Sequence, residues 1–243
     1  MITTVAVGTG KYVEQHESSS RGEVLARYRH LRQICKRHHS DALKLLSQGA
    51  ILHHARRLGL ADGKTLVLDS MDELALAFDL AIYTAPSSRS RAIGRYAKST
   101  RFASGSDEVL MLEAMCNARF AVVLAQRRHP SAGLIVTDLS RGVELWLMDE
   151  GLEMSLPVGA AFATRYYAPD RFVMTAGVGV PVDGALLMSA IESSPHLLRK
   201  PFAEAIEDRR FAEAVYRAAI ADGIVEGIYP TRIQPVPARQ PDG

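Results

Sequence analysis

The sequence predicts an α+β protein in which a helical N-terminal part precedes a small antiparallel, five-stranded β-module and further helices follow it. Three observations lead to this class. From residue 23 to about residue 39, apolar residues recur at the spacing of an amphipathic helix. Between residues 120 and 176, β-branched and aromatic runs alternate with turn residues. After Pro181 the helical spacing returns.

Local signals mark the other helices of the N-terminal part. Ser40 or Asp41 is suited to cap a second helix, and Gly49 marks a bend. Gly59 stands where a helix ends in a left-handed residue. Ser70 and its neighbours form a capping box, and Pro86 follows the helix that this box begins. The expected helices are residues 23–39, a short segment around 43–46, and residues 50–58, 74–83, 93–98 and 106–117.

The β-module is predicted from five short runs, which are residues 120–126, 134–138, 143–148, 160–167 and 172–176. Strands this short with tight turns between them are typical of a meander that curls into a small barrel or half-barrel. Trp146, the only tryptophan, alternates with Leu145 and Leu147 in one of these strands. We expect it to anchor the core of the β-module or its binding face.

These changes of pattern predict four segments. Residues 1–117 form a mainly helical, basic part, and residues 118–182 form the antiparallel β-module. Residues 183–225 contain helices, at 184–191 and 201–220, that pack on the rest. Residues 226–243 are rich in proline and are predicted to be a flexible tail.

Composition narrows the class of protein. The chain has 243 residues, of which 47% are hydrophobic, enough to bury a sizeable core. Cys35 and Cys116 are too few for a disulfide scaffold, so a reducing cytoplasm is the expected location. No window approaches the roughly 20 apolar residues that cross a bilayer. The first ten residues have no signal-peptide pattern, so we expect a soluble protein that does not associate with membranes.

Basic residues concentrate near the N-terminus. Between residues 21 and 57, nine Lys and Arg residues face only Glu23 and Asp41, a local net charge of +7 in a chain whose formal net charge is +2. Basic helix faces neutralise phosphates, and an aromatic ring among them can stack on a base. A solvated face, or a face docked on the acidic remainder of the chain, is the alternative. The candidate residues for binding nucleic acid or a protein partner are Arg29, Arg32, Lys36, Arg37, Arg91, Arg95, Tyr96 and Lys98.

Two glycine-containing segments match nucleotide-binding loops only in part. Residues 59–65 place three residues between their glycines, whereas a P-loop needs four, and a helix rather than a strand precedes them. Gly177 and Gly179 follow a strand, but Val182 stands where a dinucleotide fingerprint has its third glycine. We therefore predict a helix end and a closing segment of the β-module at these places, and no cofactor.

Metal and catalytic signals are also incomplete. Cys35 and His39 are one helical turn apart, and a helical hairpin would bring His38, His53 and His54 near them, but no complete zinc signature is present. Cys35 also lies on the apolar stripe of its helix. No serine lies in a nucleophile elbow, and the clustered carboxylates fit helix caps and turns. The sequence thus predicts no metal site and no assigned catalytic residue.

Three segments resemble a group of uncharacterised bacterial proteins. These are RLGLADGKTLVLDS at residues 57–70, GSDE at 105–108 and DLSRGVELW at 138–146. The resemblance extends from about residue 45 to residue 182. It implies a bacterial origin and a helical part joined to a β part, and it implies no particular activity, cofactor or catalytic residue.

The sequence favours a non-catalytic binding or regulatory protein, in which the β-module and the basic helices form a surface for a partner. One alternative is a hydrolase or nuclease with a dispersed active site, and another is a structural subunit of a larger assembly. Convergent carboxylates or histidines in an acidic cleft would favour the enzyme. A continuous basic surface would favour nucleic acid.

Overall fold

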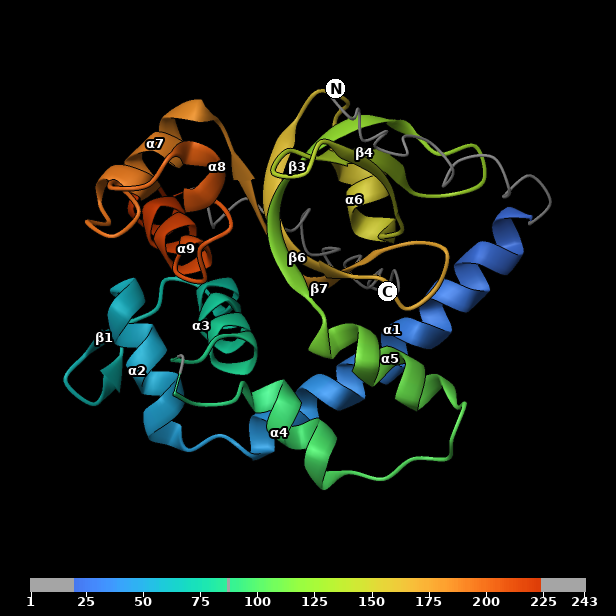
Figure 1. The fold of residues 1–243 in the computed structure, drawn as a ribbon, viewed down its shortest axis with the longest axis horizontal. Coiled ribbons are helices and arrows are strands. Elements are labelled where there is room, and N and C mark those ends of the chain that lie inside the picture. Colours follow the sequence, from blue (N-terminus) through green and yellow to red (C-terminus); the bar gives the residue numbers. More distant parts are fainter. Residues whose placement is uncertain (1–19, 87, 224–243) are drawn as a thin grey trace, which may run out of the picture.

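The computed structural model describes residues 20–86 and 88–223, and its elements confirm the α+β class (Figure 1). The helices are α1 (Arg21–Lys44), α2 (Gln48–Leu58), α3 (Met71–Tyr83), α4 (Ala92–Ser99), α5 (Asp107–Cys116), α6 (Glu150–Ser155), α7 (Gly184–Glu192), α8 (Phe202–Ala205) and α9 (Phe211–Ala221). The strands are β1 (Ala61–Asp62), β2 (Thr65–Leu66), β3 (Arg119–Arg128), β4 (Leu134–Asp138), β5 (Val143–Leu147), β6 (Ala161–Tyr167) and β7 (Met174–Val182). The tail predicted at 226–243 lies outside the described residues.

Side-chain caps begin the helices of the N-terminal part. Ser70 and Glu73 form the predicted capping box, in which each side chain accepts a hydrogen bond from the other residue's backbone N–H. Ser20 and Glu23 form a second box at the start of α1. Gly59 ends α2 with a φ of 82°, a left-handed conformation that glycine adopts without strain.

The prediction of a separate helix capped at Ser40 or Asp41 is wrong. The first helix continues through both residues to Lys44. Ala42 is fully buried four residues after the buried His38, so one apolar stripe runs on without a break. Because this stripe packs against the core, tertiary contacts outweigh the local capping preference of Ser40 and Asp41.

The main sheet has the strand order β5-β4-β3-β6-β7, and every neighbouring pair is antiparallel. Its two edges meet only at an isolated bridge between Leu147 and Val173, so the sheet is not a closed barrel. Of the two predicted forms, the half-barrel is the one that fits. Figure 1 shows the sheet curling around α6.

Three predictions for the sheet and the helices after it are wrong. The last strand, predicted to end at residue 176, extends to Val182, so the segment with Gly177 and Gly179 that was predicted to close the β-module is itself part of the strand. Helix α6 lies where only turn residues were expected, and the Asp149 carboxylate caps it. The helix predicted at 201–220 is divided into α8 and α9 by a turn, in which the backbone N–H of Phe211 donates to the carbonyl of Asp208.

The sheet is covered on both faces. Val122 belongs to a hydrophobic cluster with residues of α2, α3, α7 and α9, whereas the next residue, Val123, belongs to a cluster with Leu156 beside α6. A third cluster joins α1, α4 and α5 to the β5 edge of the sheet, around Trp146 and Met148. Helices from both ends of the chain therefore pack on one sheet, and the predicted divisions at residues 117 and 182 stay a prediction.

Candidate anion-binding pocket

The arginines predicted to bind a partner from α1 contact carboxylates of this chain. Nη2 of Arg29 lies 2.7 Å from the carboxylate of Glu150. Nη2 of Arg37 lies 3.2 Å from that of Glu108. Both arginines are well exposed, so each pair adds at most about 1 kcal/mol to stability.

Arg32 is more enclosed than its neighbours on α1. Its Nη2 lies 2.9 Å from the carboxylate of Asp149, and its Nη1 donates to the backbone carbonyl of Thr175. Burial alone would lower the pKa of this guanidinium, but nearby groups including Asp149 raise it, so the side chain stays charged. These contacts match the alternative in which the basic helix docks on acidic parts of the chain.

The other basic residues predicted to bind a partner differ in what their side chains contact. The side chains of Arg91 and Arg95 both donate to backbone carbonyls. Lys36 and Lys98 are exposed, and neither forms an ion pair with a described residue. A role of these side chains in binding nucleic acid stays a prediction.

Tyr96, the aromatic residue predicted to stack on a base, belongs to the core beneath α1. It is 6% exposed, and its hydroxyl lies 3.1 Å from Nδ1 of His38. Nε2 of the same histidine lies 3.0 Å from the backbone carbonyl of Glu108. These contacts tie α4 and α5 to α1.

Cys35 lies in a buried polar network. Its Sγ is 2.7 Å from the hydroxyl of Tyr167 and 3.6 Å from Nδ1 of His39. Nε2 of His39 in turn lies 2.7 Å from the hydroxyl of Tyr83. Burial alone would raise the pKa of the thiol, but the neighbouring His39 and Arg32 bring it below its ordinary value.

The residues considered as metal ligands are not gathered in one place. Cys35 contacts His39, and His38 contacts Tyr96 on the α4 side. His53 and His54 pack on each other on α2, with ring centroids 5.4 Å apart. Within the described parts of the chain, no group of three or more His, Cys, Asp or Glu side chains is arranged to hold a metal ion.

His54 is expected to make the protein less stable as the pH falls from about 7 to about 4. Burial, followed by the neighbouring His53 and Arg57, lowers its pKa from 6.5 to about 4. In that window the unfolded chain binds a proton at this residue and the folded chain does not, so stability rises with pH and is lost on acidification. The expected loss at the acid end is about 2–3 kcal/mol.

Urea unfolding at several pH values measures this effect. His54→Gln should flatten the dependence of the unfolding free energy on pH between about 7 and 4. The exposed His196 provides a matched control, since His196→Gln should keep the dependence of the unchanged protein. An equally steep pH dependence in His54→Gln would contradict the assignment.

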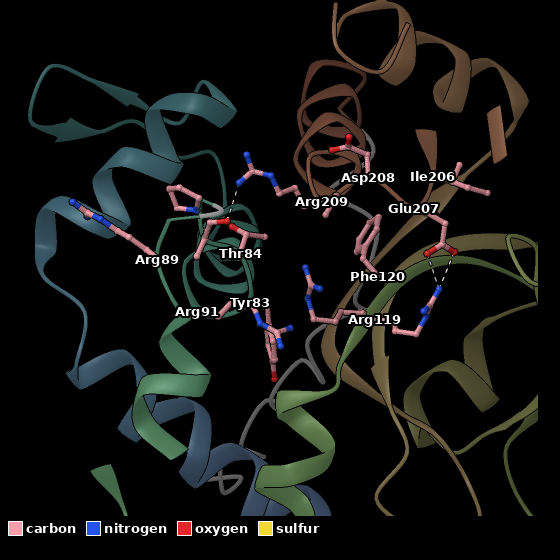
Figure 2. A pocket seen from close by; sticks show the side chains of 14 residues that line it. Tyr83, Thr84, Arg89, Arg91, Arg119, Phe120, Ile206, Glu207, Asp208 and Arg209 are labelled. Carbon is pink, nitrogen blue, oxygen red and sulfur yellow. Dashed lines mark hydrogen bonds and ion pairs between the residues drawn. The ribbon is translucent and has the colours of Figure 1, made fainter. Parts of the chain in front are cut away.

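A cavity of about 390 Å³ lies where the helices of both ends meet the sheet (Figure 2). Its walls come from the end of α3 and the loop after it, the start of β3, one residue of β6, and the turn between α8 and α9 with the start of α9. Two carboxylates, Glu207 and Asp208, line it. Its lining also contains five arginines, Arg89, Arg91, Arg119, Arg165 and Arg209.

Arg165 is the most enclosed of these arginines. It lies at an irregularity of β6, where the pairing with β7 shifts register between Thr164 and Tyr166. Such bulges interrupt the ladder and redirect a side chain. On the other side it pairs with Phe120 of β3, so both residues lie next to each other on the sheet.

A buried carboxylate holds the guanidinium of Arg165 in place. Its Nε lies 3.0 Å and its Nη2 3.1 Å from the oxygens of Asp79 on α3, which also accepts a hydrogen bond from the Tyr216 hydroxyl at 3.1 Å. The guanidinium carbon is 4.9 Å from the centre of the Tyr83 ring. Burial alone would lower the pKa of Arg165, but Asp79 raises it, so the group stays charged. Its Nη1 has no hydrogen-bond partner among the described residues.

Arg119 is the first residue of β3. Its Nη2 is 2.8 Å from both carboxylate oxygens of Glu207, a contact that Figure 2 shows at one side of the cavity. Its Nε is buried without a hydrogen-bond partner among the described residues. A buried donor left without an acceptor costs about 1–3 kcal/mol.

The other arginines come from the two opposite walls. Nη1 of Arg209 donates to the backbone carbonyl of Ala85 at 2.9 Å, which links the turn before α9 to the loop after α3 across the cavity. Arg91 bonds the carbonyl of Cys116. Arg89 is exposed, and its side chain has no ion pair or hydrogen bond within the described part of the chain.

The lining is strongly positive. Five arginines and two carboxylates give it a formal charge of +3. Two charged residues behind the lining have opposite signs, so they leave this value unchanged. The carboxylate of Asp79 pairs with Arg165, and the amine of Lys200 lies 2.6 Å from the carboxylate of Asp208. A concave surface with an excess of guanidinium groups attracts anions. The low-dielectric protein around it concentrates the electric field inside the cavity.

Of this set, the sequence pointed only to Arg91 and its neighbour Arg89, as part of a basic segment around Tyr96. The arginines are separated by up to 120 positions and meet only in the fold. Two local signals were present in the sequence. Asp79 interrupts the apolar helix at 74–83, and Arg165 interrupts a strand of apolar and aromatic residues. A charged residue inside a buried run is seldom found without a partner of opposite charge.

Comparisons with known proteins place the chain in a family without assigning it an activity. No curated protein and no solved structure matches it significantly. Within residues 20–86 and 88–223, no helix has the length and apolar character needed to cross a membrane. The family of unknown function DUF7986 matches residues 23–226, in agreement with the resemblance to uncharacterised proteins. The chain therefore belongs to the DUF7986 family.

Proposed function

We propose that this protein is a non-catalytic binding or regulatory protein that takes a small anionic ligand into the arginine-lined cavity. The observation that carries the proposal is the buried guanidinium of Arg165, held by Asp79 and with Nη1 unengaged among the described residues. A guanidinium that is already desolvated and oriented donates strong, charge-assisted hydrogen bonds to phosphate or carboxylate oxygens.

The lining favours binding over catalysis. Its two carboxylates are held in ion pairs, Glu207 by Arg119 and Asp208 by Lys200. Burial alone would raise the pKa of Asp208, but Lys200 lowers it below its ordinary value, so this carboxylate is ionised at neutral pH. A general acid or base works best with a pKa near the operating pH, and arginine does not provide one.

Replacing Arg209 by Gln is expected to weaken the binding of pyrophosphate at least tenfold. Arg209 bonds only a backbone carbonyl among the described residues, so the substitution removes a cation without leaving a carboxylate unpaired. A charge-assisted hydrogen bond is worth about 1.5–3 kcal/mol, and 1.4 kcal/mol is a factor of ten in affinity. Isothermal titration calorimetry at low ionic strength measures the dissociation constant.

Arg37→Gln is the control for charge, since it removes one cation from the exposed face of α1, away from the cavity. It should leave the affinity within twofold of that of the unchanged protein. Circular dichroism and melting temperature show whether each variant is folded. Equal losses in Arg209→Gln and Arg37→Gln would indicate non-specific attraction to positive charge, and absence of binding to the unchanged protein would refute the proposal.

A further inference from the structure

The charge of the cavity indicates a ligand with several negative charges. One carboxylate is saturated by a single bidentate arginine, but the lining brings five arginines and a formal charge of +3. A diphosphate carries a comparable negative charge and offers many acceptor oxygens to guanidinium groups placed on different walls. Arg165, Arg119 and Arg209 come from β6, β3 and the turn before α9, so they can surround such a group.

The size of the cavity indicates that the ligand is more than a diphosphate. Its volume is about 390 Å³. Cavities that hold organic ligands occupy about 300–1,000 Å³, whereas one water takes up about 30 Å³ in the liquid. A pyrophosphate ion would leave much of this space to solvent, so an organic group is expected beside the charged one.

Apolar residues supply a surface for that organic group. Phe120, Ile206 and Pro86 line the same cavity as the arginines, and Figure 2 shows Phe120 between Arg209 and Arg119. The phenyl ring is half-buried. Edge-on contacts with Tyr216, at 5.4 Å between ring centroids, and with Phe211, at 6.0 Å, hold it in place. A fixed aromatic ring beside cationic groups is suited to stack on a base.

We propose that the ligand of this cavity is a nucleoside diphosphate, with its phosphates on the arginines and its base against Phe120. This inference rests on the proposed anion-binding function and narrows it to one class of ligand. Recognition comes from guanidinium groups rather than from a glycine-rich loop, which agrees with the incomplete P-loop at residues 59–65. Binding is accordingly expected without a divalent cation.

Calorimetric titration of the full chain with ADP, pyrophosphate and adenosine, each in the presence of EDTA, tests the inference. ADP should bind about tenfold more tightly than pyrophosphate, because stacking of one base contributes about 1–3 kcal/mol. Adenosine, which lacks the phosphates, should bind at least a hundredfold more weakly than ADP. Arg209→Gln should weaken both phosphate ligands.

Phe120→Leu separates the two parts of the site. It keeps an apolar side chain of similar size but removes the ring, so ADP affinity should fall about fivefold or more while pyrophosphate affinity stays the same. Phe102→Leu, on the loop before α5 and outside the lining, is the matched control and should change neither. A melting curve shows whether Phe120→Leu is folded. If it is not, titration of the unchanged protein with the three ligands still tests the inference.

The outcomes distinguish the two proposals. If pyrophosphate binds and depends on Arg209 but ADP binds no better, the nucleotide inference is wrong and the anion-binding function stands. If adenosine binds as tightly as ADP, the arginines do not determine the ligand and the inference is also wrong. If neither phosphate ligand binds, both proposals fail.

Discussion

Replacing Asp79 by Ala is expected to lower the free energy of unfolding by about 3–5 kcal/mol, because it leaves the buried guanidinium of Arg165 without its counter-charge. The two side chains are only 2% and 6% exposed, and three N–O contacts of 3.0–3.2 Å join them. The change also removes the acceptor of the Tyr216 hydroxyl, which is itself fully buried. Equilibrium unfolding in urea measures the difference.

Two comparisons make this result specific. Glu144→Ala removes one partner of the exposed pair with Arg127 and should cost no more than about 1 kcal/mol. Asp79→Leu combined with Arg165→Met replaces the buried pair by apolar groups and should recover most of the lost stability. A loss below 1 kcal/mol for Asp79→Ala would mean that Arg165 is solvated or paired elsewhere.

Trp146→Ala is expected to cost about 3–5 kcal/mol, the range for removing a large aromatic residue from a core. The residue is 9% exposed, and its ring lies edge-on to Phe172 and stacks on His129 at 3.9 Å between centroids. Its Nε1 also donates to the carbonyl of Ala132 at 2.7 Å. The sequence left open whether this residue belongs to the core or to a binding face, and its burial favours the core.

Urea unfolding of Trp146→Ala and Trp146→Phe separates the contributions of packing and hydrogen bonding. The Phe variant keeps a ring and loses the indole N–H, so it should be the less destabilised of the two. The exposed Met154 offers a control on α6, where Met154→Ala should change stability by less than about 0.5 kcal/mol. An unchanged melting temperature in Trp146→Ala would contradict the core assignment.

Most of the helices and strands were predictable because local chemistry determines where they begin and end. The capping box at Ser70, the left-handed Gly59 and the alternation around Trp146 act within a few residues and give the same result in the folded chain. The length of α1 and the existence of α6 were not predictable in this way. The first depends on packing of Ala42 against distant residues, and the second depends on the curled sheet that encloses a short helix.

The pocket was not predictable from the sequence, because its charge depends on which arginines find partners. The densest basic run lies on α1, yet Arg29 and Arg32 reach carboxylates more than 110 positions away. The cavity collects arginines that are scattered through the sequence, and Arg165 gains its orientation from Asp79, 86 positions away. Local charge density therefore pointed to α1, where Arg29 and Arg32 pair with carboxylates of the chain, and gave no indication of the cavity in which arginines outnumber carboxylates.

The measurement that tests the central claim most directly is a crystal structure of the full chain grown with pyrophosphate. The account predicts a diphosphate in the cavity, with oxygens about 2.7–3.2 Å from Nη1 of Arg165 and from the guanidinium nitrogens of Arg209. Occupied density on the α1 face, with only solvent between Arg165 and Arg209, would contradict it.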